Sequence, residues 1–444
     1  MQYPISEISS PKSLKKYFKK DGFLYNVGTM MAGNVTAQLA VVLLAPVITR
    51  LYLPEHIGVM AVIISIVSVL SVISCMRYEM AVVLPKSEKE AQNLVAICLA
   101  LTIIISLVSL VAIPFVNEWA ESLAQIQGVR FFLYLVPLGV IAHGLETTFR
   151  FWFTRKKNFA LIAKTRMITP LSTNGIKIVA GLLVGSSIFW LIIGDILGIS
   201  IVAAIFAIAF IQNNFQQFKN SISQREIRAV ARKYDSFPKY DSVTALMNAI
   251  SQNLPAFLFA YYFSFEFVGY YALAGKILKK PVQLVSNSVR GVFLQRVAEI
   301  RGKGKNARSN FIKTTAALAA LGIIPFGILA IEGEWIFSFV FGAKWATAGL
   351  YARFLSPWLF LLFINPPATQ IILIEQKLFY HLIFQIFLLS FRGIAIISGY
   401  YISSDPWVAV ALFSGVGVIA NFILIVYAYK LTSDNESPAA ENRR

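Results

Sequence analysis

The chain has 444 residues, of which 57% are hydrophobic and only 14% are charged, and its formal net charge is +18. Because a soluble domain contains about 25% charged residues, this composition excludes an ordinary soluble protein and indicates an integral membrane protein. The positive charge does not indicate a nucleic-acid partner, because the lysines and arginines lie in short segments between long apolar runs. The two cysteines, Cys75 and Cys98, lie in apolar segments and predict no disulfide framework.

Apolar runs of about twenty residues, the length that crosses a bilayer as a helix, occur twelve times along the chain. We therefore expect an all-α polytopic membrane protein with twelve transmembrane helices in two pseudo-symmetric lobes of six. The expected spans of the first lobe are Phe23–Ile48, Ile57–Met76, Ala91–Val116, Val129–Phe149, Phe159–Val184 and Ile188–Ile211. Those of the second lobe are Ser242–Phe263, Phe267–Phe293, Phe311–Ile331, Ala348–Ile374, Leu378–Ile402 and Trp407–Tyr429.

The basic residues predict the orientation of these spans. The segments on one side of the membrane would hold 28 lysines and arginines, including five lysines among the first twenty residues. The segments on the other side would hold only Arg50, Arg130 and Lys344. Because lysine and arginine favour the cytosolic side, we expect both termini in the cytosol. Tryptophans near span ends, Trp358 among them, are expected to anchor the chain at the membrane interface.

Polar residues of the first two spans are candidates for binding or gating. Asn34 and Gln38 share one face of the first span, where their amides could bind sugar hydroxyls or join neighbouring helices through hydrogen bonds. Arg77 and Glu79 follow the second span at its expected cytosolic end. They could gate a cavity or simply mark the edge of the membrane.

Several acidic residues could take part in ion coupling or in structural ion pairs. Glu146 precedes Arg150 by four residues, which predicts a local pair on one helix. Lys177 and Asp195 lie near the expected outer ends of the fifth and sixth spans, where we expect them to pair. Alternatively, Glu146, Asp195 and Asp241 could each bind a coupling proton or sodium ion.

The chain is expected to have four parts: an N-terminal lobe (1–211), a basic cytosolic linker (212–240), a C-terminal lobe (241–431) and a disordered cytosolic tail (432–444). The linker could form an amphipathic helix on the inner membrane surface or a solvated helix. A repeat supports the two lobes, because Glu-x-(Ile/Val)-Gly-x-x-Ala-(Val/Leu) occurs at both 55–62 and 266–273.

The stretch from Gly269 to Arg296 carries the strongest candidate site. Steps of four, three, four and three place five polar residues on one face of the eighth span: Lys276, Lys280, Gln283, Asn287 and Arg290. A cation at mid-membrane depth costs about 2.5–3.5 kcal/mol. We therefore expect this face, together with Lys279, to line a water-filled cavity that accepts an anion. The alternative is that the lysines pair with acids on neighbouring helices.

Two other spans of the second half add candidate binding residues. Asn248 and Gln252 lie on one face of the seventh span, and their amides have the same two alternatives as those of the first span. Arg392 lies midway along the eleventh span, where it could bind a sugar phosphate or line a polar groove.

Several short stretches together resemble Wzx-type oligosaccharide flippases, in the polysaccharide transport branch of the multidrug/oligosaccharidyl-lipid/polysaccharide (MOP) exporter superfamily. The similarity extends over most of the chain. The stretches are Arg77-Tyr-Glu-Met-Ala-Val-Val-Leu-Pro85, Ser251-Gln-Asn-Leu-Pro255, Val268-Gly-Tyr-Tyr-Ala-Leu-Ala274, Phe341-Gly-Ala-Lys-Trp345 and Ala352-Arg-Phe-Leu-Ser-Pro357.

The resemblance implies two six-helix lobes of the MATE-like kind that work by alternating access. It also implies movement of undecaprenyl-pyrophosphate-linked oligosaccharide repeat units from the cytosolic to the outer leaflet, as in the synthesis of O-antigen lipopolysaccharide or capsule. The expected location is the bacterial plasma (inner) membrane. A polysaccharide polymerase and a chain-length regulator are expected as partners.

Two other functions stay open. A MATE-like drug antiporter would need buried acids for cationic cargo, and a membrane polysaccharide polymerase or ligase would need a large outer loop or clustered catalytic acids. The sequence contains no ATP-binding loop, and His56, His143 and His381 lack the spacing of metal ligands. We therefore expect a secondary transporter rather than an enzyme, without a metal or cofactor apart from a coupling proton or sodium ion.

Overall fold

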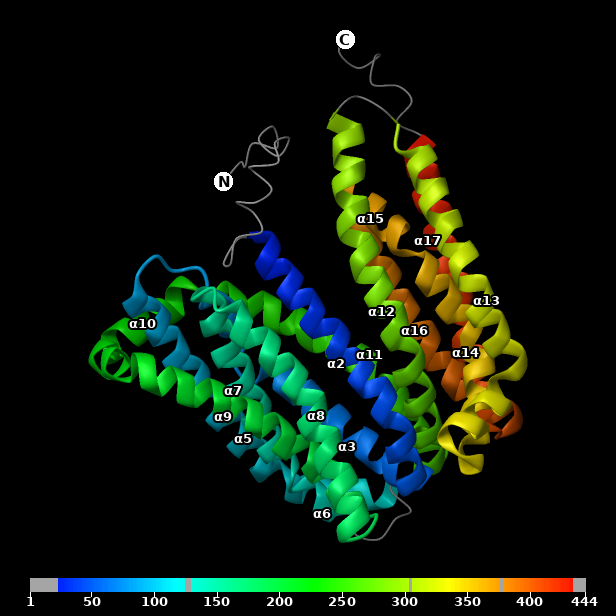
Figure 1. The fold of residues 1–444 in the computed structure, drawn as a ribbon. Helices are drawn as coiled ribbons and strands as arrows, with labels where there is room; N and C mark the ends of the chain where they lie inside the picture. Colours follow the sequence, from blue (N-terminus) through cyan, green and yellow to red (C-terminus); the bar gives the residue numbers. More distant parts are fainter. Residues whose placement is uncertain (1–22, 124–128, 303–305, 376–377, 434–444) are drawn as a thin grey trace. The chain divides into compact units, whose positions relative to one another are not determined.

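The computed structural model describes residues 23–123, 129–302, 306–375 and 378–433, and every regular element among these residues is a helix. Contacts divide the chain, drawn in Figure 1, into two compact units. The first unit comprises residues 1–51, 63–122 and 126–252, and the second comprises residues 52–62, 123–125 and 253–444. Two helices, α3 (Pro54–Ile73) and α11 (Ser242–Tyr262), therefore contribute residues to both units.

The first unit is a helical bundle around an aromatic core. Helix α2 packs on α8, α8 on α9, and α9 on α7. The rings of Phe153 and Phe206 stack at 5.5 Å, and Trp152 meets Phe210 edge-on at 5.1 Å. The remaining helices of this unit are α2 (Phe23–Leu51), α4 (Tyr78–Ala81), α5 (Glu88–Leu123), α6 (Val129–Leu133), α7 (Val136–Arg155), α8 (Phe159–Leu183), α9 (Ile188–Ser221), α10 (Gln224–Lys233) and the π-helix Phe237–Asp241.

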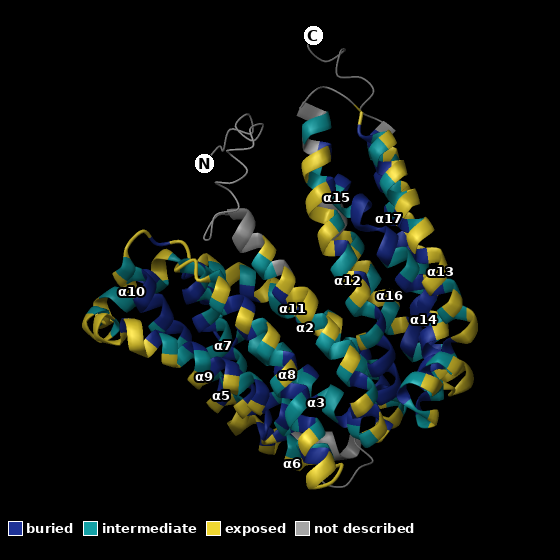
Figure 2. Cartoon of the chain, viewed as in Figure 1, coloured by how far each residue is buried: buried dark blue, intermediate teal, exposed yellow. Residues whose placement is uncertain are grey.

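The second unit is built around α14, which packs on α12, α13 and α17 and is mostly buried (Figure 2). Gly342, with a φ of 104°, ends α13 and turns the chain toward α14, because a positive φ favours glycine. The helices of this unit are α12 (Phe265–Gly302), α13 (Arg308–Phe341), the 3-10 helix Ala343–Trp345, α14 (Ala346–Ile364), α15 (Pro366–Ile374), α16 (Leu378–Ser403) and α17 (Pro406–Ser433).

Each of the twelve expected spans falls on a long helix or on two consecutive helices. The fourth span is divided into α6 and α7, and the tenth into α14 and α15, with Pro137 and Pro366 in the first turns of the later helices. Nine helices of the described chain are long and apolar enough to cross a membrane. Large apolar side chains are exposed along them, with Phe115 at 83% and Phe339 at 70%. The expected all-α multi-pass membrane fold is confirmed, while the count of twelve spans stays a prediction.

The two copies of the sequence repeat contact one another in the second unit. A Cβ atom on Gly58 of α3 would lie 1.7 Å from the carbonyl oxygen of Phe265, and one on Gly269 of α12 would lie 1.9 Å from that of Pro54. These distances are below any van der Waals contact, so only glycine permits this approach of the two backbones.

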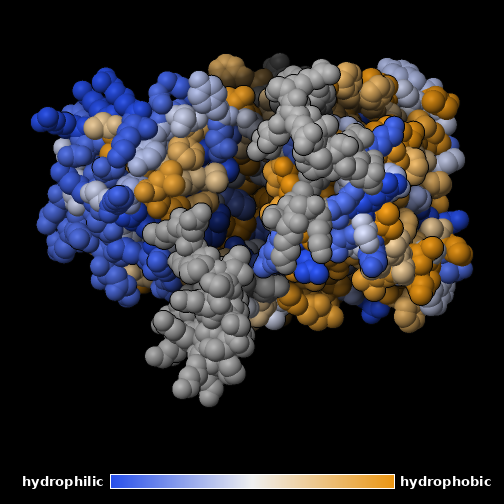
Figure 3. Space-filling view, turned by 90° about the horizontal axis from the view of Figure 1, so that it is seen from above, coloured by the Kyte–Doolittle hydropathy of each residue, from blue (hydrophilic) through white to orange (hydrophobic). Residues whose placement is uncertain are grey.

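Within the expected linker, α10 packs its apolar face against the first unit. Val230 is buried in the aromatic core and Ile227 packs beside it. Two ion pairs, Lys89–Glu226 at 3.0 Å and Lys233–Glu90 at 2.7 Å, join α10 to the start of α5. Seen from above in Figure 3, the left-hand part of the surface, where α10 lies, is mostly hydrophilic. The apolar face of α10 is therefore covered by protein rather than available to a membrane surface.

The lobe boundaries given above stay predictions. Helix α17 continues to Ser433, and the rest of the expected tail lies outside the described residues, as do the five N-terminal lysines.

Candidate functional site

The predicted polar face of α12 is accessible in the second unit. Lys276, Gln283, Asn287 and Arg290 are exposed, and Lys280 is half-buried. The opposite side of the helix packs inward, with Tyr271, Leu278 and Val282 buried, as the helical period requires. No ion pair among the described residues involves Lys280 or Arg290.

Lys279 points to a different side of α12, against aromatic rings. Its Nζ lies 5.4 Å from the centroid of the Trp358 indole ring on α14 and 6.0 Å from that of the Tyr271 ring. From α16, the guanidinium carbon of Arg392 lies 4.8 Å from the Trp358 ring and 5.1 Å from the Phe413 ring. Two cations from different helices therefore share one indole. We call these five residues the cation–aromatic cluster.

The cluster exists because α14 and α17 pack closely. A Cβ on Gly417 of α17 would lie 2.4 Å from the Trp358 ring, so the absence of a side chain there makes room for the indole. Trp358 is only 4% exposed. The expectation that it anchors the membrane interface is therefore wrong; its ring supports Lys279 and Arg392.

The two cations lack a carboxylate partner among the described residues. The Nε atom of Arg392 is buried and has no hydrogen-bond partner there. Cation–π contacts stabilise each charge by about 0.5–2 kcal/mol, but they do not cancel the repulsion between the two charges. An anion placed between Lys279 and Arg392 would remove that repulsion, so the cluster is suited chemically to bind one.

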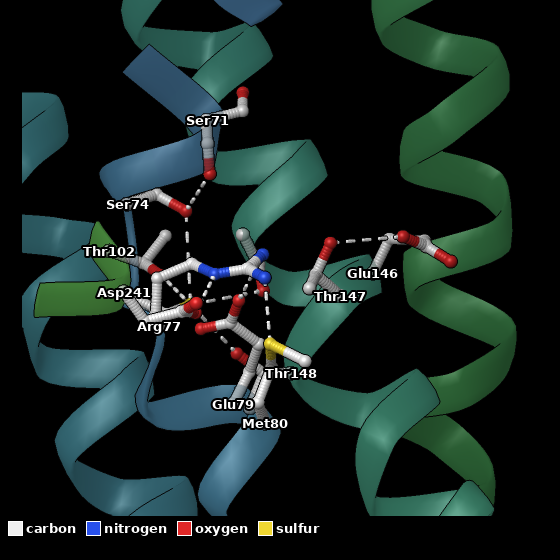
Figure 4. A network of polar contacts seen from close by, with 12 residues as sticks. Ser71, Ser74, Arg77, Glu79, Met80, Thr102, Glu146, Thr147, Thr148 and Asp241 are labelled. Atoms are coloured by element: carbon white, nitrogen blue, oxygen red, sulfur yellow. Dashed lines mark hydrogen bonds and ion pairs between the residues drawn. The ribbon is translucent and has the colours of Figure 1, made fainter. Parts of the chain in front are cut away.

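A second polar network lies in the first unit, at the turn between α3 and α5 (Figure 4). The Nε of Arg77 donates at 2.7 Å to Oδ2 of Asp241, the last residue of the π-helix that precedes α11, and its Nη1 lies 3.5 Å from Glu79 Oε1. Arg77 and the preceding Met76 both have left-handed backbone, with φ values of 63° and 46°. Two successive non-glycine residues in this region are strained, and such strain is found most often at functional sites.

Glu79 is the buried member of this network. Its residue exposure is 3%, and its Oε2 atom has no partner among the described residues. Burial, followed by the nearby thiol of Cys75, raises the pKa of Glu79 to about 7. Arg77 and Arg150 oppose the shift without cancelling it. The carboxyl group can therefore change its protonation state near neutral pH.

The two expected ion pairs of the first unit are present. Lys177, which is 2% exposed, donates to Asp195 Oδ1 at 2.6 Å, and Arg150 donates to Glu146 Oε1 at 2.9 Å. Gly194 makes the first pair possible, because a Cβ there would lie 2.6 Å from Lys177 Cγ.

The candidate amides are also in the first unit. Asn34 is exposed and accepts a hydrogen bond from Arg166, while Gln38 is half-buried with its Oε1 unpartnered among the described residues. Gln252 donates to Asn248 at 3.3 Å on the exposed side of α11. The sequence interpretation did not identify the Asn34–Arg166 contact, since only the packing of α2 on α8 brings the two residues together.

Comparison with solved structures identifies the class of fold. The inward-closed lipid II flippase MurJ aligns with a TM-score of 0.62 and 14% identity, covering 92% of this chain and 87% of that one. An inward-facing multidrug resistance MATE family transporter of the MOP superfamily aligns with a TM-score of 0.60 and 13% identity, covering 92% and 96%. The chain therefore has the fold of MOP-superfamily transporters, as its resemblance implied.

The sequence itself defines the family more narrowly. Residues 47–349, more than half of the chain, match the family model for polysaccharide biosynthesis proteins, and the protein belongs to this family. A search of curated proteins finds no match.

Proposed function

We propose that this protein translocates an oligosaccharide linked to a polyprenyl pyrophosphate, such as undecaprenyl pyrophosphate, from the cytosolic to the outer leaflet of a bacterial plasma membrane. The observation that carries the proposal is the cation–aromatic cluster, in which Lys279 and Arg392 lie beside one indole without a described acid. Family membership in polysaccharide biosynthesis and the MOP-superfamily fold support it.

The pyrophosphate is the part of this substrate that matches the cluster. It carries concentrated negative charge, which an ammonium group binds as a point charge and a guanidinium binds through paired N–H donors. The accessible face of α12, with Lys276 and Lys280, adds positive charge on the same helix. The amides of Asn248 and Gln252 both donate and accept hydrogen bonds, as sugar hydroxyls require.

The same observation separates this proposal from export of cationic drugs, another activity that this fold could carry. A cationic molecule would be repelled by Lys279 and Arg392, and binding would add a charge to a site that already lacks acids. An anionic cargo instead completes the set of charges.

We further propose that a proton or sodium gradient drives transport, with the Arg77–Glu79–Asp241 network as a gate.

The test is transport of a synthetic polyprenyl-pyrophosphate disaccharide in proteoliposomes, with and without a pH or sodium gradient. Lys279→Gln combined with Arg392→Gln should lower transport about a hundredfold, because each change removes a charge-assisted contact. Lys276→Ala with Lys280→Ala is expected to abolish it. Arg353→Gln is the control, since Arg353 forms an exposed pair with Glu334 and should transport normally. Full transport by both double variants, or transport of cationic dyes instead of the lipid-linked sugar, would refute the proposal.

A further inference from the structure

A close contact between α2 and α8 of the first unit places an amide against a guanidinium. Gly33 is buried in this contact, and a Cβ there would lie 3.1 Å from the carbonyl oxygen of Ala163. Asn34 follows Gly33 on α2 and is exposed. Arg166 lies three residues after Ala163 on α8 and is half-buried. Arg166 Nη1 donates to Asn34 Oδ1 at 2.6 Å.

This hydrogen bond determines what the pair offers to a ligand. A guanidinium group can only donate hydrogen bonds, so the carbonyl oxygen of Asn34 must face Arg166. The amide nitrogen of Asn34, with its two N–H donors, is then left for other partners. Arg166 also keeps donors that no described residue occupies. The pair therefore presents donors, whereas a sugar hydroxyl requires both a donor and an acceptor to be satisfied fully.

The charge around the pair is also unbalanced. Arg150 and Glu146 of α7 are within electrostatic reach of Arg166, and they pair with each other at 2.9 Å. Among the described residues, the charges that act on Arg166 are thus one guanidinium and one carboxylate, which offset each other and leave the positive charge of Arg166 itself unbalanced. In an apolar bundle, such an excess charge is costly unless water or an anion reaches it.

We propose that Arg166 and Asn34 form a binding site for an acidic sugar in the transported oligosaccharide, so that the protein prefers repeat units with a carboxylate over neutral ones. A sugar carboxylate accepts hydrogen bonds at both oxygens and carries the missing negative charge, which matches a pair that donates and is positive. This inference rests on the proposed function and deepens it by naming the class of sugar.

The experiment compares two synthetic polyprenyl-pyrophosphate disaccharides that differ only at one carbon, with a terminal glucuronic acid or a terminal glucose. In proteoliposomes, the wild-type protein should transport the acidic substrate more efficiently. Arg166→Gln should lower transport of the acidic substrate about tenfold to a hundredfold and change transport of the neutral one little. Lys164→Gln, an exposed cation on the same helix, is the control and should transport both as the wild type does.

A second variant keeps the test informative if Arg166→Gln fails to fold. Asn34→Asp places a carboxylate against Arg166, which cancels the charge of the guanidinium, and it should remove the preference for the acidic substrate. Equal losses for both substrates in Arg166→Gln would instead assign Arg166 to the shared pyrophosphate and overturn the inference. Wild-type transport of the neutral substrate alone would also overturn it while leaving the proposed function intact; transport of neither would refute the proposed function itself.

Discussion

The glycine contact between the two repeat copies makes a sharp prediction about stability. We expect Gly269→Ala to destabilise the protein. The new Cβ would lie 1.9 Å from the carbonyl oxygen of Pro54, whereas a relaxed contact requires about 3 Å, so α12 and the start of α3 would have to separate by about 1 Å. The neighbour is backbone, which cannot rotate out of the way as a side chain can.

The size of the effect follows from three contributions. Overpacking of this kind costs about 1–3 kcal/mol. Loss of close Cα–H contacts to the facing carbonyl adds about 0.5–1 kcal/mol. The higher helix propensity of alanine offsets about 0.5–1 kcal/mol. The expected net loss is therefore about 1–3 kcal/mol.

The assay is thermal unfolding of the detergent-purified protein, with Gly291→Ala as the control. Gly291 lies on the same helix, and a Cβ there would have nothing within 4 Å, so this variant should be as stable as the wild type or slightly more stable. Gly58→Ala should destabilise like Gly269→Ala. The double variant should cost less than the sum, because one separation of the helices accommodates both methyl groups. Strictly additive losses, or a Gly269→Ala protein as stable as Gly291→Ala, would refute this account of the contact.

Two further predictions concern buried charges. Burial raises the folded-state pKa of Glu79 from its ordinary value of 4.5 to about 7. Its ionisation should therefore remove up to about 3 kcal/mol of stability as the pH rises from 4.5 through 7. Glu79→Gln should lack this part of the pH dependence in melting curves, and identical pH slopes in the two proteins would contradict the prediction. Lys177→Met should destabilise the protein by about 3 kcal/mol in the same assay, because Asp195 loses its partner. Adding Asp195→Leu should restore most of the lost stability. No recovery in the double variant would show that Lys177 stabilises the protein through contacts other than its pair with Asp195.

The features that the sequence predicted well depend on local periodicity. Apolar runs of about twenty residues located all the long helices, since hydropathy acts within one segment. The 3.6-residue period correctly separated the accessible face of α12, with Gln283 and Asn287, from its packed face, with Leu278 and Val282. The repeat was visible because the same backbone approach requires glycine at both Gly58 and Gly269.

The cation–aromatic cluster shows why the rest could not be predicted. Lys279 and Lys280 are adjacent in sequence, but about 100° apart on the helix, so the partner helix decides their environments. That partner, Trp358, is distant in sequence, and its ring fits only because Gly417 on a third helix leaves space. No single-segment pattern carries this information, so the sequence alone predicts Trp358 at the interface and Lys279 with the exposed face.

The turn at Arg77 suggests why the chain retains strained backbone there. A left-handed residue other than glycine costs about 1–2 kcal/mol, and two occur in succession. Arg77 nevertheless reaches Asp241, 164 positions away, and Tyr78 donates to the carbonyl of Ala231 in α10 at 3.0 Å. Both contacts hold the segment between α9 and α11 on the first unit. Glycine at position 77 would relieve the strain but lose the ion pair, so the arginine is explained by the contact that it makes and not by the turn.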